Sequence, residues 1–130
     1  SSMGYSLPAA IAAKIVHPQR PVVSFIGDGG FAMVQGELGL AAALKLDPVV
    51  IVFCDGSLNR IELKQMKRNY PSWGTLIERV DLAQLAPAMG CEGVMVDNAG
   101  ALHDALARRA PGRPLVIGAV IDPAQYAAQF

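Results

Sequence analysis

Residues 22–33 read VVSFIGDGGFAM, and this stretch decides the fold. The β-branched and aromatic run at residues 22–26 is typical of a buried strand. Three glycines then fall within four positions, and such a turn after a strand lets backbone N–H groups approach a phosphate. Asp28 stands between two of these glycines, where its carboxylate repels a phosphate unless a cation lies between them.

A second stretch repeats this arrangement further along the chain. Pro48 precedes the apolar run VVIVF at residues 49–53, and Cys54, Asp55 and Gly56 follow it. If the two strands are parallel neighbours, Asp28 and Asp55 lie side by side at the carboxyl edge of the sheet. Two carboxylates at close range repel unless a proton or a cation is shared. A Mg²⁺ ion bound by both carboxylates, a carbonyl and phosphate oxygens explains why glycines and aspartates occur together at these strand ends.

The rest of the chain alternates between helical and strand patterns. We expect strands at 22–26, 49–53, 94–96 and 115–121, and helices at 5–16, 34–46, 59–68, 82–89 and 99–109, with a possible short helix in the tail 122–130. This order predicts an α/β fold, a single domain with a parallel β-sheet flanked by helices on both faces. Tyr70 and Trp73 fall in a loop, where we expect them to pack.

Composition excludes several classes of protein. The 130 residues suffice for about one domain, and 52% hydrophobic with 17% charged residues describe a globular chain. Eleven basic and eleven acidic residues cancel, which gives no electrostatic case for nucleic acid or a membrane surface as partner. The apolar runs are shorter than the roughly 20 residues of a spanning helix. Cys54 and Cys91 form no CxxC pair, and we expect a cytoplasmic location.

The strand ends allow three other interpretations. The pattern Gly27-x-Gly29-x-x-Ala32 matches the dinucleotide fingerprint, but Asp28 would then face a pyrophosphate with no metal between them. A phosphoacceptor receiver domain needs a second acid beside the first and a lysine after a late strand, and Lys67 is the last lysine here. The two aspartates could also simply start turns and cap helices, although the matching glycines at both strand ends disfavour this.

The residues resemble a known family. The run GDGGFAMVQGELGLAAALKLDPVVIVFCDGSLN, residues 27–59, resembles the thiamine-diphosphate signature, which begins with GDG and closes near an Asn-Asn or Asn-Asp pair. Asp28 and Asp55 are 27 residues apart, as in the acetolactate synthase and pyruvate decarboxylase group. Residues 1–10 resemble the family's glycine-rich segment ahead of the diphosphate site, and residues 121–126 resemble the C-terminal region of acetolactate synthase-like large subunits, so that the similarity covers nearly the whole chain.

The resemblance implies a role for each matching residue. Asp28 and Asp55 match the two side-chain ligands of Mg²⁺, with Asn at the second position in many members. The main-chain carbonyl of Ser57 matches the third ligand. Gly29 and Gly30 match positions whose N–H groups bind the diphosphate, and many members have Ser in place of Gly30.

Further matches lie on either side of this core. Asn59 begins a helix whose N-terminus favours the diphosphate charge. Met3 matches the bulky apolar residue that holds the cofactor bent in a V. Ser1 stands at a position often held by Gly, whose carbonyl meets the aminopyrimidine. Cys54 replaces a common Asn, and we expect it to be a small buried residue.

The family implies Mg-dependent decarboxylation and carboligation of 2-oxo acids, with acetolactate synthase-like lyase or transferase chemistry. A 2-oxo acid decarboxylase, a pyruvate oxidase-type enzyme and a non-catalytic cofactor-binding module remain alternatives, and FAD binding stays open. No catalytic residue is assigned, because the activating glutamate belongs to the pyrimidine-binding domain of a second subunit in this family. None of the chain's glutamates matches it: Glu37, Glu62, Glu78 and Glu92. Residues 1–130 are therefore expected to be the diphosphate-binding part of a longer, multidomain, homo-oligomeric enzyme, and to be inactive alone.

Overall fold

The protein forms a four-stranded parallel sheet with the strand order β1-β2-β4-β3. The computed structural model describes residues 2–124 and 126. The strands are β1 Val23–Gly27, β2 Val49–Cys54, β3 Glu92–Val96 and β4 Leu115–Val120. β1 and β2 pair directly along their whole length, with Ile26 opposite Val52 and Gly27 opposite Phe53. The predicted parallel sheet, with these two strands as neighbours, is confirmed.

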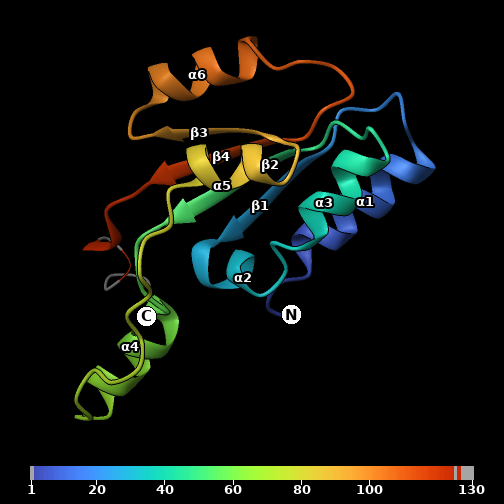
Figure 1. Cartoon of the computed structure of the whole chain (residues 1–130). Helices are drawn as coiled ribbons and strands as arrows, with labels where there is room; N and C mark the ends of the chain where they lie inside the picture. The colour runs from blue at the N-terminus through green and yellow to red at the C-terminus, as the bar shows by residue number, and fades with distance from the viewer. Residues whose placement is uncertain (1, 125, 127–130) are drawn as a thin grey trace.

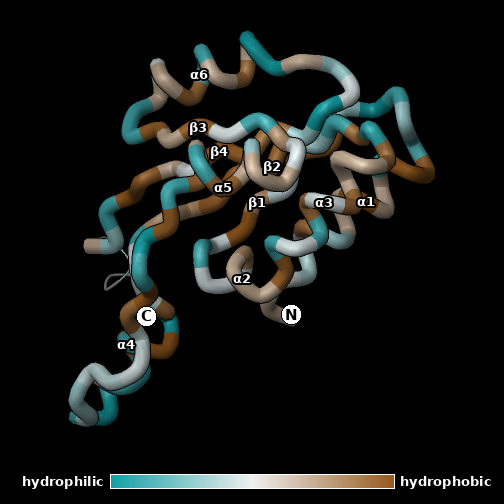
Figure 2. Tube along the Cα trace, in the orientation of Figure 1, coloured by the Kyte–Doolittle hydropathy of each residue, from teal (hydrophilic) through white to brown (hydrophobic). Residues whose placement is uncertain are grey.

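Helices lie on both faces of this sheet, as the alternation predicts (Figure 1). They are α1 Ser6–Val16, α2 Asp28–Ala32, α3 Glu37–Ala43, α4 Asn59–Lys67, α5 Leu82–Ala88 and α6 Ala99–Ala107. On one face, α1, α3 and α5 bury Leu7, Leu38 and Ala86 against the strands. On the other face, α6 packs on Ile117 and its neighbours. Hydrophobic residues predominate along β1, β2 and β4, which lie between these layers (Figure 2).

The second face is covered only in part. α6 packs over β3 and β4, whereas over β1 and β2 the side chains of Val23, Phe25 and Phe53 are 47%, 58% and 38% exposed. The rings of Phe25 and Phe53 stack with their centroids 6.0 Å apart. These three residues, called the β1–β2 patch below, form an apolar surface along β1 and β2.

α4 has little to pack on. It contains no buried residue along its described length, and Figure 1 shows it extending away from the sheet together with the loop that follows. Trp73 and Tyr70 lie in this loop and are 83% and 62% exposed, so the expectation that they pack is wrong. The loop instead folds back along the turn after β2 and forms two backbone hydrogen bonds with it. The Leu58 amide donates to the Thr75 carbonyl, and the Ile77 amide donates to the Gly56 carbonyl.

Two helices depart from the sequence-based expectation. The glycine-rich turn after β1 is itself a short helix, α2, because Asp28 accepts a hydrogen bond from the Gly29 amide and Phe31 is buried beneath it. α3 occupies only the middle of the predicted 34–46 helix. Gly36 stands at its N-cap, and Lys45 with φ of 52° ends it in the left-handed conformation, where Leu46 bonds back to Ala41.

One buried charge anchors the other end of the sheet. Lys14 is 4% exposed, and its Nζ forms an ion pair with Asp47, which lies just before β2, at 2.5 Å. The same Nζ donates to the carbonyls of Pro18 and Arg20. The hydrogen bond from Lys14 holds the pKa of Asp47 below its ordinary value. In the described part of the chain, no helix is long and apolar enough to cross a membrane.

Candidate cofactor-binding site

The two predicted metal-binding aspartates lie at the same edge of the sheet. Asp28 follows β1 as the first residue of α2, and Asp55 follows β2, its direct neighbour. Asp28 Oδ1 accepts a hydrogen bond from the Gly29 amide at 2.8 Å, and Asp28 Oδ2 accepts one from the Gly56 amide at 2.9 Å. The Asp28 carboxylate therefore connects the two strand ends directly.

The turn after β2 places Asp55 beside Asp28. Gly56 has a φ of 76°, which suits glycine, and the Ser57 amide donates to Asp55 Oδ1 at 3.0 Å. Burial raises the pKa of Asp55, and repulsion from the Asp28 carboxylate raises it further, while the Ser57 hydrogen bond acts in the opposite direction. A cation between the two carboxylates would remove this repulsion.

This donor set fits Mg²⁺ chemically. Carboxylate oxygens are preferred ligands of this ion, and each oxygen that accepts an amide hydrogen bond still has a second lone pair. Two carboxylates leave further positions for a main-chain carbonyl and for ligand oxygens. Among residues 2–124 and 126, no group of three His, Cys, Asp or Glu side chains is placed to hold a metal, so the two carboxylates need other oxygen ligands beside them.

A cavity of about 780 Å³ opens at this edge of the sheet. Six of the seven sequence-predicted site residues line it, namely Met3, Gly29, Gly30, Asp55, Ser57 and Asn59. The seventh, Asp28, lies beside the cavity and is bonded to Gly29 and Gly56 at its wall. Ser1 lies outside the described residues. The fold thus brings the predicted residues together, and their roles stay predictions.

Gly29 forms a tight part of the cavity wall. A Cβ atom at this position would lie 2.6 Å from Leu58 Cδ2, 2.9 Å from Ile77 Cδ1 and 3.1 Å from Met3 Cε. Because Leu58 and Met3 themselves line the cavity, any side chain at position 29 would push atoms into it. Glycine here keeps space open next to the backbone N–H groups of α2.

α4 begins at Asn59, as the sequence predicts, and its first turn faces the cavity. Asn59, Arg60 and Ile61 all line the cavity from this turn, and no described side chain caps it. The N–H groups and the dipole of a helix N-terminus favour an anion. A diphosphate is therefore a compatible ligand at this position.

Sequence reasoning missed several residues of the site. Tyr126 lines the cavity from the C-terminal segment, and burial raises its pKa, with Asp55 and Asp28 adding to the effect. Glu62 accepts hydrogen bonds from the hydroxyls of Ser72 and Ser57, which hold its pKa below the ordinary value. The sequence assigned neither residue a role, because the tertiary fold brings Tyr126 to the cavity and Ser72 to Glu62.

Cys54 is not a nucleophile in this site. It is 3% exposed at the end of β2, as predicted for a small buried residue. Burial, with repulsion from Asp28 and Asp55, raises the pKa of its thiol to about 11. The thiol therefore stays protonated at neutral pH, and the reactive thiolate is absent.

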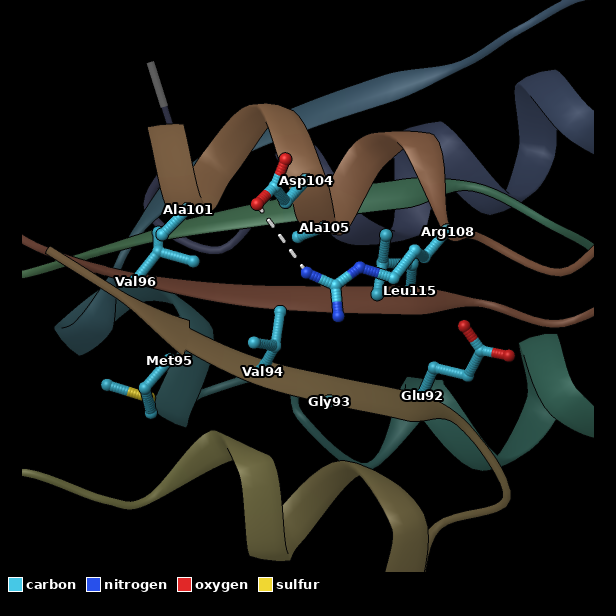
Figure 3. Close-up of a pocket in the computed structure, with 10 residues that line it drawn as sticks. All are labelled: Glu92, Gly93, Val94, Met95, Val96, Ala101, Asp104, Ala105, Arg108 and Leu115. Carbon is cyan, nitrogen blue, oxygen red and sulfur yellow. Dashed lines mark ion pairs between the residues drawn. The ribbon is translucent and has the colours of Figure 1, made fainter. Parts of the chain in front are cut away.

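A second, smaller cavity of about 310 Å³ lies between β3 and α6 (Figure 3). Its floor is apolar, with Val94, Val96 and Ala101 among the lining residues. At its rim, Arg108 and Asp104 lie 3.6 Å apart, and both side chains are largely exposed. None of the predicted site residues within the described chain lines this cavity, so the first cavity is the candidate site.

A family model agrees with this geometry. Residues 1–119 match the model described as "Thiamine pyrophosphate enzyme, C-terminal TPP binding domain". The chain belongs to the thiamine pyrophosphate enzyme family. This confirms the resemblance that residues 27–59 carry.

Relatives and solved structures extend the match. The chain is 36% identical over 110 residues to the putative thiamine pyrophosphate-containing protein YdaP of Bacillus subtilis, covering 82% of this chain and 19% of that protein. It is 37% identical over 105 residues to the catabolic acetolactate synthase of Raoultella terrigena, covering 81% of this chain and 19% of that protein. The thiamine diphosphate-dependent 4-hydroxybenzoylformate decarboxylase of Rhodococcus jostii RHA1 superposes with a TM-score of 0.81 at 26% identity, over 94% of this chain and 24% of that one. The chain thus spans about a fifth of the length of the curated relatives it matches.

Proposed function

We propose that this chain binds the diphosphate of thiamine diphosphate through Mg²⁺, as part of an enzyme that decarboxylates a 2-oxo acid. One observation carries the proposal: Asp28 and Asp55 follow two adjacent strands at the same edge, and Asp28 accepts the amide of Gly56, the residue after Asp55. The cavity beside them offers glycine amides and the N-terminus of α4 to an anion.

Each predicted residue has a definite part in this proposal. Asp28, Asp55 and the main-chain carbonyl of Ser57 hold the cation. The N–H groups of Gly29 and Gly30, with the first turn of α4, bind the diphosphate. Met3 lies at the cavity wall beside Gly29, where an apolar side chain can support the cofactor from below.

When bound, thiamine diphosphate supplies the electron sink that accepts the electron pair of a decarboxylating 2-oxo acid. This chain's residues bind and orient the cofactor and keep its diphosphate end out of bulk water. No glutamate lies among the described residues that line the cavity. We therefore propose that a pyrimidine-binding domain from a second subunit supplies the activating glutamate, and that the working enzyme is a homo-oligomer.

We propose acetolactate synthase-like carboligation as the reaction, and simple decarboxylation as the second candidate. The carboligase is supported by the catabolic acetolactate synthase relative, and the decarboxylase by the probable 2-ketoarginine decarboxylase AruI of Pseudomonas aeruginosa, at 36% identity over 91 residues. Product analysis with the full-length enzyme and pyruvate separates the two. Formation of acetolactate supports carboligation, and formation of acetaldehyde supports simple decarboxylation. If neither product forms when the cofactor is added, both candidates are contradicted.

A further inference from the structure

Glu62 connects two segments that are distant in the sequence. It lies in the first turn of α4, where its Oε2 accepts a hydrogen bond from Ser57 Oγ at 2.7 Å. Its Oε1 accepts a second hydrogen bond from Ser72 Oγ at 2.5 Å. Ser72 Oγ in turn lies 3.1 Å from Thr75 Oγ1. One carboxylate thus holds the turn after β2 and the returning loop together.

The segment that Glu62 holds is the turn at residues 55–57, called the cation turn below. Its backbone is already bonded on two sides: the Gly56 amide donates to Asp28, and the Gly56 carbonyl accepts from the Ile77 amide at 2.8 Å. The Ser57 amide donates to Asp55. The side chain of Ser57 adds a further restraint, because its hydroxyl donates to Glu62.

Glu62 lies outside the cavity wall. It is not among the described residues that line the cavity, and both of its oxygens accept hydroxyl hydrogen bonds. It is therefore no proton donor to a molecule in the cavity. Glu62 also differs from an unpaired surface carboxylate, because each of its oxygens accepts a hydrogen bond from a hydroxyl of a separate segment.

We propose that Glu62 is a positioning residue that fixes the cation turn, so that the main-chain carbonyl of Ser57 stays in place for the Mg²⁺ ion. The inference rests on the proposed function. Mg²⁺ demands a nearly ideal octahedral arrangement of ligands, so a small displacement of one carbonyl weakens its binding.

The test measures the Mg²⁺ concentration that gives half-maximal binding of thiamine diphosphate, by calorimetric titration of the wild-type protein and variants. Glu62→Ala should raise this concentration about tenfold, while the cofactor affinity at saturating Mg²⁺ stays within about threefold. Glu62→Gln should show a smaller shift, because its amide oxygen still accepts one hydroxyl. Glu78→Ala, which removes an exposed glutamate that follows the same loop, should match the wild type.

A double-mutant comparison separates positioning from a general loss of charge. Ser57→Ala should raise the Mg²⁺ requirement as Glu62→Ala does, and the double variant should shift by less than the sum of the two, because either change removes the Ser57–Glu62 hydrogen bond while only Glu62→Ala also removes the bond from Ser72. An unchanged Mg²⁺ requirement in a folded Glu62→Ala overturns the inference, as do additive shifts in the double variant. If Glu62→Ala does not fold, Glu62→Gln takes its place, and an unchanged Mg²⁺ requirement in that variant overturns the inference. A wild-type protein whose cofactor binding needs no Mg²⁺ refutes the proposed cation site itself, and this inference with it.

Discussion

Gly29→Ala should weaken cofactor binding while leaving the fold nearly unchanged. The added methyl group would lie 2.6 Å from Leu58 Cδ2, 2.9 Å from Ile77 Cδ1 and 3.1 Å from Met3 Cε. All three atoms are ends of flexible side chains, so they can move aside into the cavity. Alanine also gains up to about 1 kcal/mol over glycine within a helix such as α2. We therefore expect the free energy of unfolding, measured by urea titration, to change by less than about 1 kcal/mol.

Binding differs because the ligand needs the space that the displaced side chains enter. Overpacking a filled site costs about 1–3 kcal/mol, which corresponds to about 5- to 150-fold weaker binding of thiamine diphosphate in calorimetric titration. Gly39→Ala on α3 is the matched control, because its methyl group would meet no atom within 4 Å. This control should bind the cofactor as the wild type does. A cofactor Kd for Gly29→Ala within about twofold of the wild type would refute the reasoning.

Three further predictions concern surface, charge and catalysis. Phe25→Lys, in the β1–β2 patch, should reduce self-association in analytical ultracentrifugation, and an unchanged distribution would contradict this role of the patch. Because Lys14 lowers the pKa of Asp47, the stability from this carboxylate is present above about pH 4 and is lost as the pH falls through the lowered value. The free energy of unfolding of Asp47→Asn, measured by urea titration at several pH values, should lack this loss at acid pH. A pH dependence like that of the wild type would argue against the Lys14–Asp47 ion pair. The 130-residue chain should release no CO₂ when mixed with Mg²⁺, thiamine diphosphate and pyruvate, because no glutamate lines the described cavity. Turnover on the order of 1–10³ per second would disprove this prediction.

The strand ends could be predicted from sequence because each combines a strong local pattern with a simple topological rule. The apolar runs at 22–26 and 49–53 have few alternatives to a buried strand, and parallel strands bring their carboxyl ends to one edge. The adjacency of Asp28 and Asp55 follows from these two facts. The start of α4 at Asn59 likewise follows from local pattern.

Other features depend on contacts between distant residues. Glycines at positions 29 and 30 disfavour a helix locally, yet α2 forms because Asp28 accepts the Gly29 amide and Phe31 is buried. The exposure of Trp73 reflects how the loop after α4 is bonded to the cation turn rather than to the core. The placement of Tyr126 at the cavity also arises only through the tertiary fold.

The most direct measurement is thiamine diphosphate binding by calorimetry in Mg²⁺ and in EDTA, for the wild type and for Asp28→Ala and Asp55→Ala. Asp28→Ala removes the acceptor of two amides, so circular dichroism must accompany it to show that the sheet persists. The proposed site predicts binding by the wild type in Mg²⁺ only, and no binding by either folded variant. Unchanged cofactor affinity in either variant, or binding by the wild type in EDTA, would contradict a cation held between the two strand ends.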